Sequence, residues 1–300
     1  MLKVAWNEHY TIDLPEGHRF PMIKYDLVPE QLLYEGTISQ ANIFSPQAIA
    51  EENLLQIHES AYWQKLKDGK LSGDEIRKMG FPYSQALVER ELVILQGTID
   101  CALFAREYGV AMNVAGGTHH AFSDRGEGFC LLNDIAVAAC YLLQNALARQ
   151  VLVVDLDVHQ GNGTAHIFRN ESRVFTFSIH GGKNYPLKKE ASDLDIDLPD
   201  GIGDADYLHL LQSHLPRLID QIEPDFIFYQ SGVDVLATDK LGRLGLSIAG
   251  CKNRDRFVLE ICKAHSIPVA VVMGGGYSAR ISDIVEAHAN TFRLANEIYF

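Results

Sequence analysis

Residues 151–164 read Val-Leu-Val-Val-Asp-Leu-Asp-Val-His-Gln-Gly-Asn-Gly-Thr, and this stretch decides the fold. The four leading apolar residues predict a strand buried on both faces, and the Gly-Asn-Gly segment predicts a turn after it. Asp155, Asp157 and His159 occupy alternate positions, so on an extended chain their side chains point to the same side. The pattern therefore places three polar groups at the carboxyl end of a strand, where open α/β sheets bind their ligands.

Two carboxylates and one imidazole in a small volume suit a divalent metal such as zinc. An Asp-x-Asp pair at a strand end can also serve only as a cap for the following helix. Three further strand ends favour the metal site, because each is followed by a complementary polar side chain. Largely apolar runs at 110–115, 226–229 and 268–273 precede, in that order, His119 and His120, Asp234, and Tyr277. Three glycines, 274–276, come directly before the tyrosine and leave room beside the site.

Strand-like runs alternate with helical patterns along the chain. We expect strands at 2–6, 110–115, 151–156, 174–179, 226–230 and 268–273, and helices at 84–107, 133–147, 204–221 and 250–264. Ser84 and Asp204 stand where helix N-caps are expected. The alternation predicts an α/β fold, a single domain over residues 1–300 whose parallel sheet has helices on both faces. Residues 13–80 are rich in charged and helical patterns, and we expect them to form helices and loops around the rim of the site.

The composition suits one large α/β domain, with 300 residues of which 47% are hydrophobic. No apolar stretch reaches the roughly 18 residues of a membrane span, and the N-terminal residues lack a signal-peptide pattern, so we expect neither. Five cysteines, an odd number without Cys-x-x-Cys spacing, indicate a reducing cytoplasm. The net charge of −13 argues against a nucleic-acid partner and is compatible with cationic substrates.

Four sequence blocks together resemble the histone deacetylase superfamily of zinc amidohydrolases. They are Gly-Gly-Thr-His-His-Ala at 116–121, Asp-Leu-Asp-Val-His-Gln-Gly-Asn-Gly at 155–163, Ser-Gly-Val-Asp at 231–234 and Gly-Gly-Gly-Tyr at 274–277. They occur in the family's order, and the resemblance covers most of the chain. The segments 18–22 and 239–247 look most like the class IV branch and its bacterial relatives. The resemblance implies the arginase–deacetylase fold.

The resemblance also implies a role for each matched residue. The zinc ligands would be Asp157, His159 and Asp234. The catalytic groups would be His119 with Asp155 behind it, His120, and Tyr277, whose hydroxyl polarises the substrate carbonyl. Asn162 stands where the best-known branch has an aspartate paired with the second histidine, and asparagine occurs there in other branches.

The family has an acyl channel and a structural potassium ion beneath the zinc. The channel residues would be Gly128, Phe129, Tyr185 and Gly275, with Phe129 and Tyr185 as opposite walls. The potassium ligands would be Asp155, the carbonyls of Asp157, His159 and Ile179, and the hydroxyl of Ser178.

These features predict a zinc-dependent deacylase that hydrolyses the amide of an acylated primary amine. Three protein ligands leave positions on zinc open for water and a carbonyl oxygen, and iron(II) suits the same ligands. Acetyl-lysine, longer acyl-lysines, acetylpolyamines and small amides all stay open as substrates, and so does the oligomeric state.

Two alternatives to a deacylase remain open. A two-metal ureohydrolase of the same fold typically needs an Asp-x-Asp pair at the later strand end, where Ser-Gly-Val-Asp-Val-Leu supplies one carboxylate. A non-catalytic zinc protein that recognises acyl-lysine or acts as a scaffold would keep the metal ligands without turnover.

Overall fold

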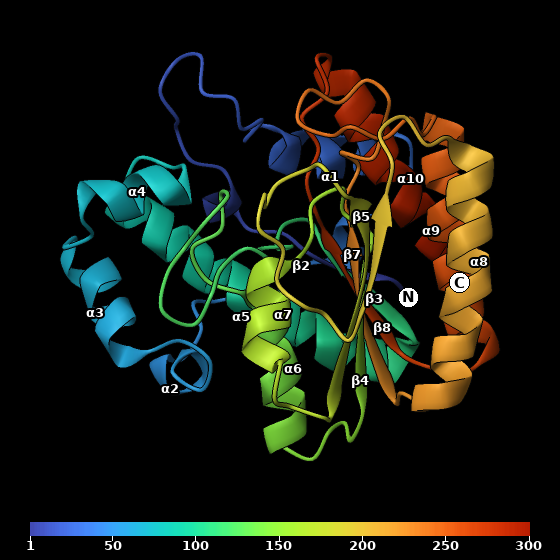
Figure 1. Ribbon diagram of the computed structural model, residues 1–300, viewed down its shortest axis with the longest axis horizontal. Coiled ribbons are helices and arrows are strands. Elements are labelled where there is room, and N and C mark those ends of the chain that lie inside the picture. The colour runs from blue at the N-terminus through green and yellow to red at the C-terminus, as the bar shows by residue number, and fades with distance from the viewer.

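The computed structural model describes residues 1–300, whose strands form one eight-stranded sheet (Figure 1). The strand order is β2-β1-β3-β8-β7-β4-β5-β6, and every neighbouring pair runs parallel. The bounds are β1 Lys3–Ala5, β2 Ile43–Phe44, β3 Val110–Asn113, β4 Val151–Asp155, β5 Val174–Gly181, β6 Leu194–Leu198, β7 Phe226–Ser231 and β8 Val269–Met273.

The four central strands, β3, β8, β7 and β4, are buried along their whole length. This explains their nearly continuous apolar sequence, because a parallel strand covered on both faces has no solvent side for polar residues. In the register, Val154 of β4 lies between Tyr229 of β7 and Phe177 of β5.

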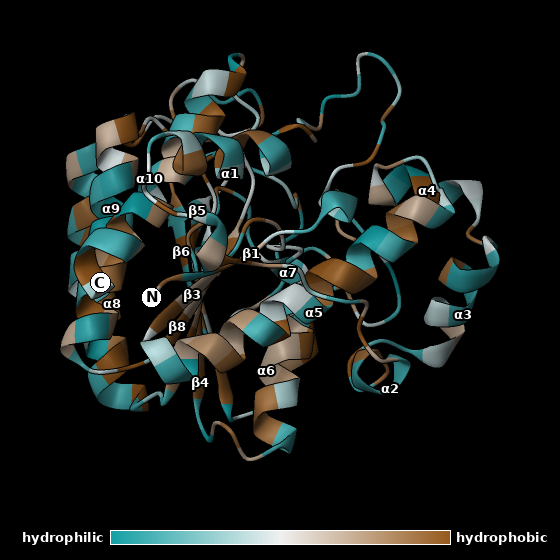
Figure 2. Cartoon of the chain, turned by 180° about the vertical axis from the view of Figure 1, so that it is seen from behind, coloured by the Kyte–Doolittle hydropathy of each residue, from teal (hydrophilic) through white to brown (hydrophobic).

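Helices cover both faces of the sheet, with α5, α6 and α7 on one side and α8, α9 and α10 on the other (Figure 1). Their bounds are α5 Gln85–Tyr108, α6 Asp134–Gln144, α7 Asn162–Phe168, α8 Asp204–Ile222, α9 Ile248–Ala264 and α10 Ile281–Tyr299. Figure 2 shows hydrophilic and hydrophobic bands on α8, as expected for a helix with one face on the sheet. No helix combines the length and the apolar character that a membrane crossing requires.

Residues 13–80 form helices and loops, as predicted, together with the two-residue edge strand β2. The helices are α1 Lys24–Tyr34, α2 Glu51–Leu54, α3 Ser60–Asp68 and α4 Gly73–Met79. The short 3-10 turn η2 Gln40–Asn42 lies in the same region, and a second one, η1 Glu8–Tyr10, precedes it. α1 packs against α10, whereas α2, α3 and α4 lie to one side of the sheet (Figure 1).

The predicted parallel sheet with helices on both faces is confirmed, and each predicted strand and helix is present with bounds shifted by at most three residues. Ser84 is the N-cap of α5, since its hydroxyl accepts from the Leu87 amide at 3.1 Å. The N-cap prediction for Asp204 was wrong. Gly203 is the N-cap of α8, and the Asp204 carboxylate instead accepts from the amide and the hydroxyl of Ser247.

Candidate active site

The polar residues that follow β3, β4, β7 and β8 meet at the carboxyl edge of the sheet. Asp157, His159 and Asp234 each offer a metal-ligand atom, and these atoms lie within 4.8 Å of one another. His159 Nδ1 is 3.1 Å from Asp157 Oδ1 and 3.1 Å from Asp234 Oδ2. The two carboxylates are fully buried, so the three predicted metal ligands share one desolvated volume.

Glycines make room for these carboxylates. A Cβ atom at Gly275 would lie 1.9 Å from Asp234 Oδ2, and one at Gly232 would lie 2.4 Å from Asp157 Oδ2. The Gly275 amide donates to Asp157 Oδ2 at 2.6 Å. A side chain at position 275 would therefore displace a carboxylate, which explains the glycine run before Tyr277.

The cluster fits a divalent cation on its own chemistry. Two buried carboxylates need a nearby positive charge, because an uncompensated charge in a desolvated site is strongly unfavourable. Burial lowers the pKa of His159, but hydrogen bonds to Asp157 and Asp234 raise it to about 10. Burial and the charge of Asp157 raise the pKa of Asp234 to about 7. A metal ion bound there would take the place of the bound protons, with one nitrogen and two oxygen ligands.

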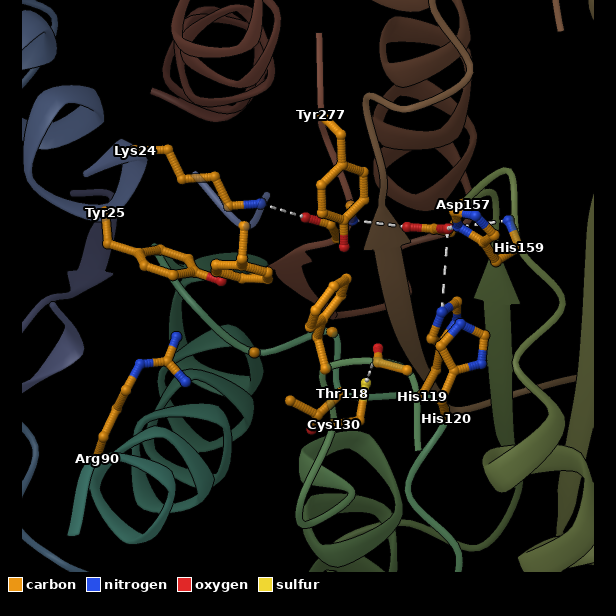
Figure 3. A pocket seen from close by; sticks show the side chains of 17 residues that line it. Lys24, Tyr25, Arg90, Thr118, His119, His120, Cys130, Asp157, His159 and Tyr277 are labelled. Carbon is orange, nitrogen blue, oxygen red and sulfur yellow. Dashed lines mark hydrogen bonds and ion pairs between the residues drawn. The ribbon is translucent and has the colours of Figure 1, made fainter. Parts of the chain in front are cut away.

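The two adjacent histidines face the same cavity and have different partners. His119 Nδ1 is 2.7 Å from Asp155 Oδ2, and His120 Nδ1 is 2.6 Å from Asn162 Oδ1. The ring centroids are 4.1 Å apart. In Figure 3 both rings lie beside Asp157 and His159. The irregular loop after β3 thus brings both imidazoles to one site, as the sequence predicted.

This loop is fixed from behind by the start of α6. The amide and hydroxyl of Thr118 both donate to Asp134 Oδ1, at 2.9 Å and 2.7 Å. Gly117 has a φ of +68°, and a Cβ there would lie 2.5 Å from the Met273 carbonyl oxygen. Only glycine suits this position, which lets the loop pass close to the end of β8.

The partners set opposite protonation preferences for the two imidazoles. Burial lowers the pKa of His119, but the charge of Asp155 and the hydrogen bond to it raise the pKa above its usual value. Burial and the charges of His119 and His159 hold the pKa of His120 well below its usual value. His119 therefore favours the charged form and His120 the neutral form.

In Figure 3 Tyr277 lies beside Asp157 and His159, across from the two histidines. Its backbone amide donates to Asp239 Oδ2 at 2.6 Å, and its ring centroid is 6.0 Å from that of Phe129. Burial and the charge of Asp234 raise the pKa of Tyr277 well above its usual value, so its hydroxyl stays protonated and can donate a hydrogen bond.

An open hollow of about 570 Å³ leads down to this site. Gly128, Phe129 and Tyr185 line it together with His120, His159 and Tyr277. The Tyr185 ring meets the His120 ring edge to face at 4.9 Å. The predicted channel residues thus lie around one cavity, with Gly275 on the deeper cavity beneath it.

Comparison with known proteins supports the resemblance that these residues carry. The histone deacetylase domain family matches residues 18–292. The chain belongs to the histone deacetylase family.

Relatives of this family member cover nearly the whole chain. An uncharacterized protein of Picosynechococcus sp. is 44% identical over 296 residues, which are 99% of each chain. Histone deacetylase 2 of Arabidopsis thaliana is 29% identical and covers 95% of this chain and 78% of its own.

Solved structures agree with the fold. An HDAC homologue from Aquifex aeolicus has a TM-score of 0.84 at 23% identity, over 98% of this chain and 84% of its own. An HDAC homologue complexed with SAHA has a TM-score of 0.82 at 24% identity, over 98% and 82%. The predicted arginase–deacetylase fold is confirmed.

The residues predicted for a potassium ion belong to β4, β5 and the segment after β4. Asp155 and Ser178 face each other in the β4–β5 register, and Ile179 is the next residue of β5. The Ser178 hydroxyl also lies 2.9 Å from His180 Nδ1, and Asp155 Oδ1 accepts from the Asp157 amide. Asp155 and Ser178 are thus neighbours, and the use of the five residues as a potassium site stays a prediction.

Sequence reasoning missed one wall of the deeper cavity, whose other lining residues include the predicted His119, His120, Asp157, His159, Gly275 and Tyr277. Phe20, Lys24 and Tyr25 reach it from the N-terminal region, and Arg90 reaches it from α5 (Figure 3). The one available signal was the 18–22 segment, which carries part of the family resemblance, contains Phe20 and ends two residues before Lys24.

Proposed function

We propose that this histone deacetylase family member hydrolyses the amide of an acylated primary amine and releases a carboxylate and a free amine. One observation carries the proposal. Three candidate metal ligands lie within 4.8 Å of one another, and two of them, Asp157 and His159, line the same cavity as His119, His120 and Tyr277. The directions of the pKa shifts favour a charged His119, a neutral His120 and a protonated Tyr277. These are the groups that amide hydrolysis at neutral pH requires.

Asp157, His159 and Asp234 would hold the catalytic metal, zinc in the first place and iron(II) as the alternative. A divalent metal bound there supplies a Lewis acid for the carbonyl and lowers the pKa of a bound water towards about 7. We also propose that Asp155, Ser178 and the carbonyls of Asp157, His159 and Ile179 hold a structural potassium ion.

His120 is the proposed general base. Its Nδ1–H donates to the Asn162 side-chain oxygen, so Nε2 carries the lone pair, and the lowered pKa keeps the ring neutral. Nε2 would take a proton from the attacking water and later give it to the departing amine nitrogen.

Tyr277 and His119 would stabilise charge. The Tyr277 hydroxyl would donate a hydrogen bond to the substrate oxygen as negative charge develops on it. His119, held by Asp155, would contribute a positive charge and orient the site. Phe129 and Tyr185 would be the walls of the acyl channel, with space provided by Gly128 and Gly275.

A ureohydrolase is less well supported, because a single cluster of three potential metal ligands is present and Asp234 is its one carboxylate from the later strand end. We prefer an enzyme to a scaffold, since the proposed general base His120 and the proposed charge-stabilising residues His119 and Tyr277 all line the cavity beside the metal-ligand cluster. Four of the five cysteines are buried free thiols, and a reducing cytoplasm is our proposed setting.

Turnover of a fluorogenic acetyl-lysine peptide tests the proposal. The purified chain is stripped with a chelator and reloaded with zinc or iron(II), and both metal content and product formation are measured. We expect activity to return with the metal in the wild type and to be absent in Asp234→Ala. Asp220→Ala, which changes an exposed carboxylate on α8, is the matched control. A fully metal-loaded protein that binds the peptide without turnover would favour the acyl-lysine recognition function instead.

A further inference from the structure

The mouth of the cavity carries positive charge although the whole chain is acidic. The charged side chains of Arg19, Arg77, Lys78 and Glu127 line the outer hollow. Arg77 and Lys78 come from the last turn of α4, and Arg19 comes from the segment that precedes α1. Cations therefore outnumber carboxylates three to one at this opening.

Two of these cations have no carboxylate partner. Glu127 accepts from Arg125 at 2.9 Å and from the Tyr185 hydroxyl at 2.7 Å, and Arg77 pairs with Asp74 at 2.7 Å. Arg19 and Lys78 are exposed and lie in no ion pair. The charged side chains that line the mouth and stay unpaired are thus both positive, although the chain has a net charge of −13.

Both residues contact the loop that forms the channel wall, Arg19 through its side chain and Lys78 through its backbone. The Arg19 guanidinium lies over the Phe129 ring at 4.9 Å from its centroid. The Lys78 carbonyl oxygen accepts from the Gly128 amide at 3.0 Å. Because the acyl group must reach His120 and Tyr277 at the bottom, the amine side of the substrate lies at this mouth.

We propose that Arg19 and Lys78 select acylated amines that carry a carboxylate on the amine side of the amide. The inference rests on the proposed deacylase function and narrows its substrates. The carboxylate would belong to an acidic residue beside an acyl-lysine or to the amino-acid end of a small amide. An acylpolyamine carries positive charge there and would be repelled.

The charges are exposed, so the preference is expected to be moderate and dependent on salt. An exposed ion pair is worth at most about 1 kcal/mol, which corresponds to about fivefold in kcat/KM for each cation. The effect should fade as ionic strength rises, because the screening length is only about 10 Å at 0.1 M salt.

The kinetic test compares acetyl-lysine peptides that differ only in flanking Glu, Ala or Lys residues. At low salt we expect the Glu peptide to exceed the Lys peptide in kcat/KM by about tenfold or more. The ratio should fall about fivefold in Arg19→Gln and in Lys78→Gln, and further in the double variant. Arg19→Lys should keep most of it, because the charge stays. Arg106→Gln changes an exposed arginine near the C-terminal end of α5, just before β3 begins, and is the control. Equal rates for the Glu and Lys peptides, or a preference for Lys, would overturn the inference.

Two further arms separate the remaining outcomes. Nε-acetyl-lysine with a free or an amidated carboxylate, and monoacetylated spermidine, distinguish a small substrate from a peptide. Faster turnover of the free acid than of the amide supports a small substrate, and preference for the spermidine overturns the inference. Fluorescence anisotropy with labelled forms of the three peptides reads binding without turnover. If the protein shows no turnover but binds the Glu peptide best, and the double variant loses this preference, the charge selection is supported while the deacylase proposal fails. Equal binding of the three peptides, or no binding, refutes the charge selection.

Discussion

Lys24 is buried in the deeper cavity without a carboxylate partner, and its titration should be visible in the stability of the protein. Only 1% of the residue is exposed, and Nζ donates to the Gly274 carbonyl oxygen at 3.0 Å. Burial lowers the pKa of Lys24 from 10.5 to about 8, although the charges of Asp234 and Asp157 offset part of the effect. The unfolded chain therefore holds this proton more tightly than the folded protein does.

The sign follows from proton linkage. Below pH 8 the lysine is charged in both states, and the burial of its charge costs about 3 kcal/mol, at about 1.4 kcal/mol for each pKa unit. Between the folded and the unfolded pKa, the folded protein has already lost the proton, so the free energy of unfolding rises with pH. At pH 9.5 the burial of the lysine charge still destabilises the folded protein by about 1 kcal/mol.

Lys24→Met removes the titrating group and keeps an apolar side chain of similar length. The unfolding free energy of the variant minus that of the wild type should fall by about 2 kcal/mol between pH 7 and pH 9.5. Packing changes and the lost hydrogen bond to Gly274 add a constant that cancels in this difference. Urea unfolding of the metal-free protein at both pH values measures it, with the exposed Lys240→Met as the control. A difference that does not change with pH would show that Lys24 is not held as a desolvated cation.

Three further predictions concern the site itself. Gly275→Ala should weaken metal binding about 10–100-fold, as changes in the outer shell of a metal site do, while the circular dichroism spectrum is unchanged. The control is Gly203→Ala, at a position with open space around it, which should leave the metal affinity unchanged. An unchanged metal affinity in Gly275→Ala would contradict the close approach of Gly275 to the Asp234 carboxylate. Tyr277→Phe should lower kcat about 10²–10³-fold with metal content unchanged, and retention of more than about half the activity would show that the hydroxyl does not act. His120→Ala should reduce kcat/KM more than His119→Ala at equal metal content, and the reverse order would assign the base to His119.

The sequence predicts the centre of the fold well because its strands are buried on both faces. Such strands have apolar runs, and the alternation of Asp155, Asp157 and His159 directly after one of them shows which end carries chemistry. β6 was missed because Leu-Asp-Ile-Asp-Leu at Leu194–Leu198 alternates polar and apolar residues, as an edge strand does, and contains no apolar run.

The wall of the deeper cavity that Lys24, Tyr25 and Arg90 form could not be predicted, because it comes from segments that are distant in sequence from the predicted site residues. Lys24 and Gly274 are 250 positions apart, and nothing near either residue indicates the contact. Arg90 and Glu91 belong to α5, where a neighbouring pair of charges is typical of a solvated helix face, yet both are almost fully buried and paired with each other. Burial of charged residues depends on tertiary packing, which local periodicity does not encode.

The charges at the mouth of the cavity differ in sign from the net charge of the whole chain. A net charge of −13 is compatible with cationic substrates, because it describes the average field of the protein at long range. A bound substrate instead senses the few side chains within a screening length, and there Glu127 is already paired with Arg125. Arg19 and Lys78 line the opening and have no such partner, so the unpaired charges on its wall have the opposite sign to the net charge of the chain. Substrate charge should therefore be inferred from the unpaired groups at the opening, which favour an acidic substrate.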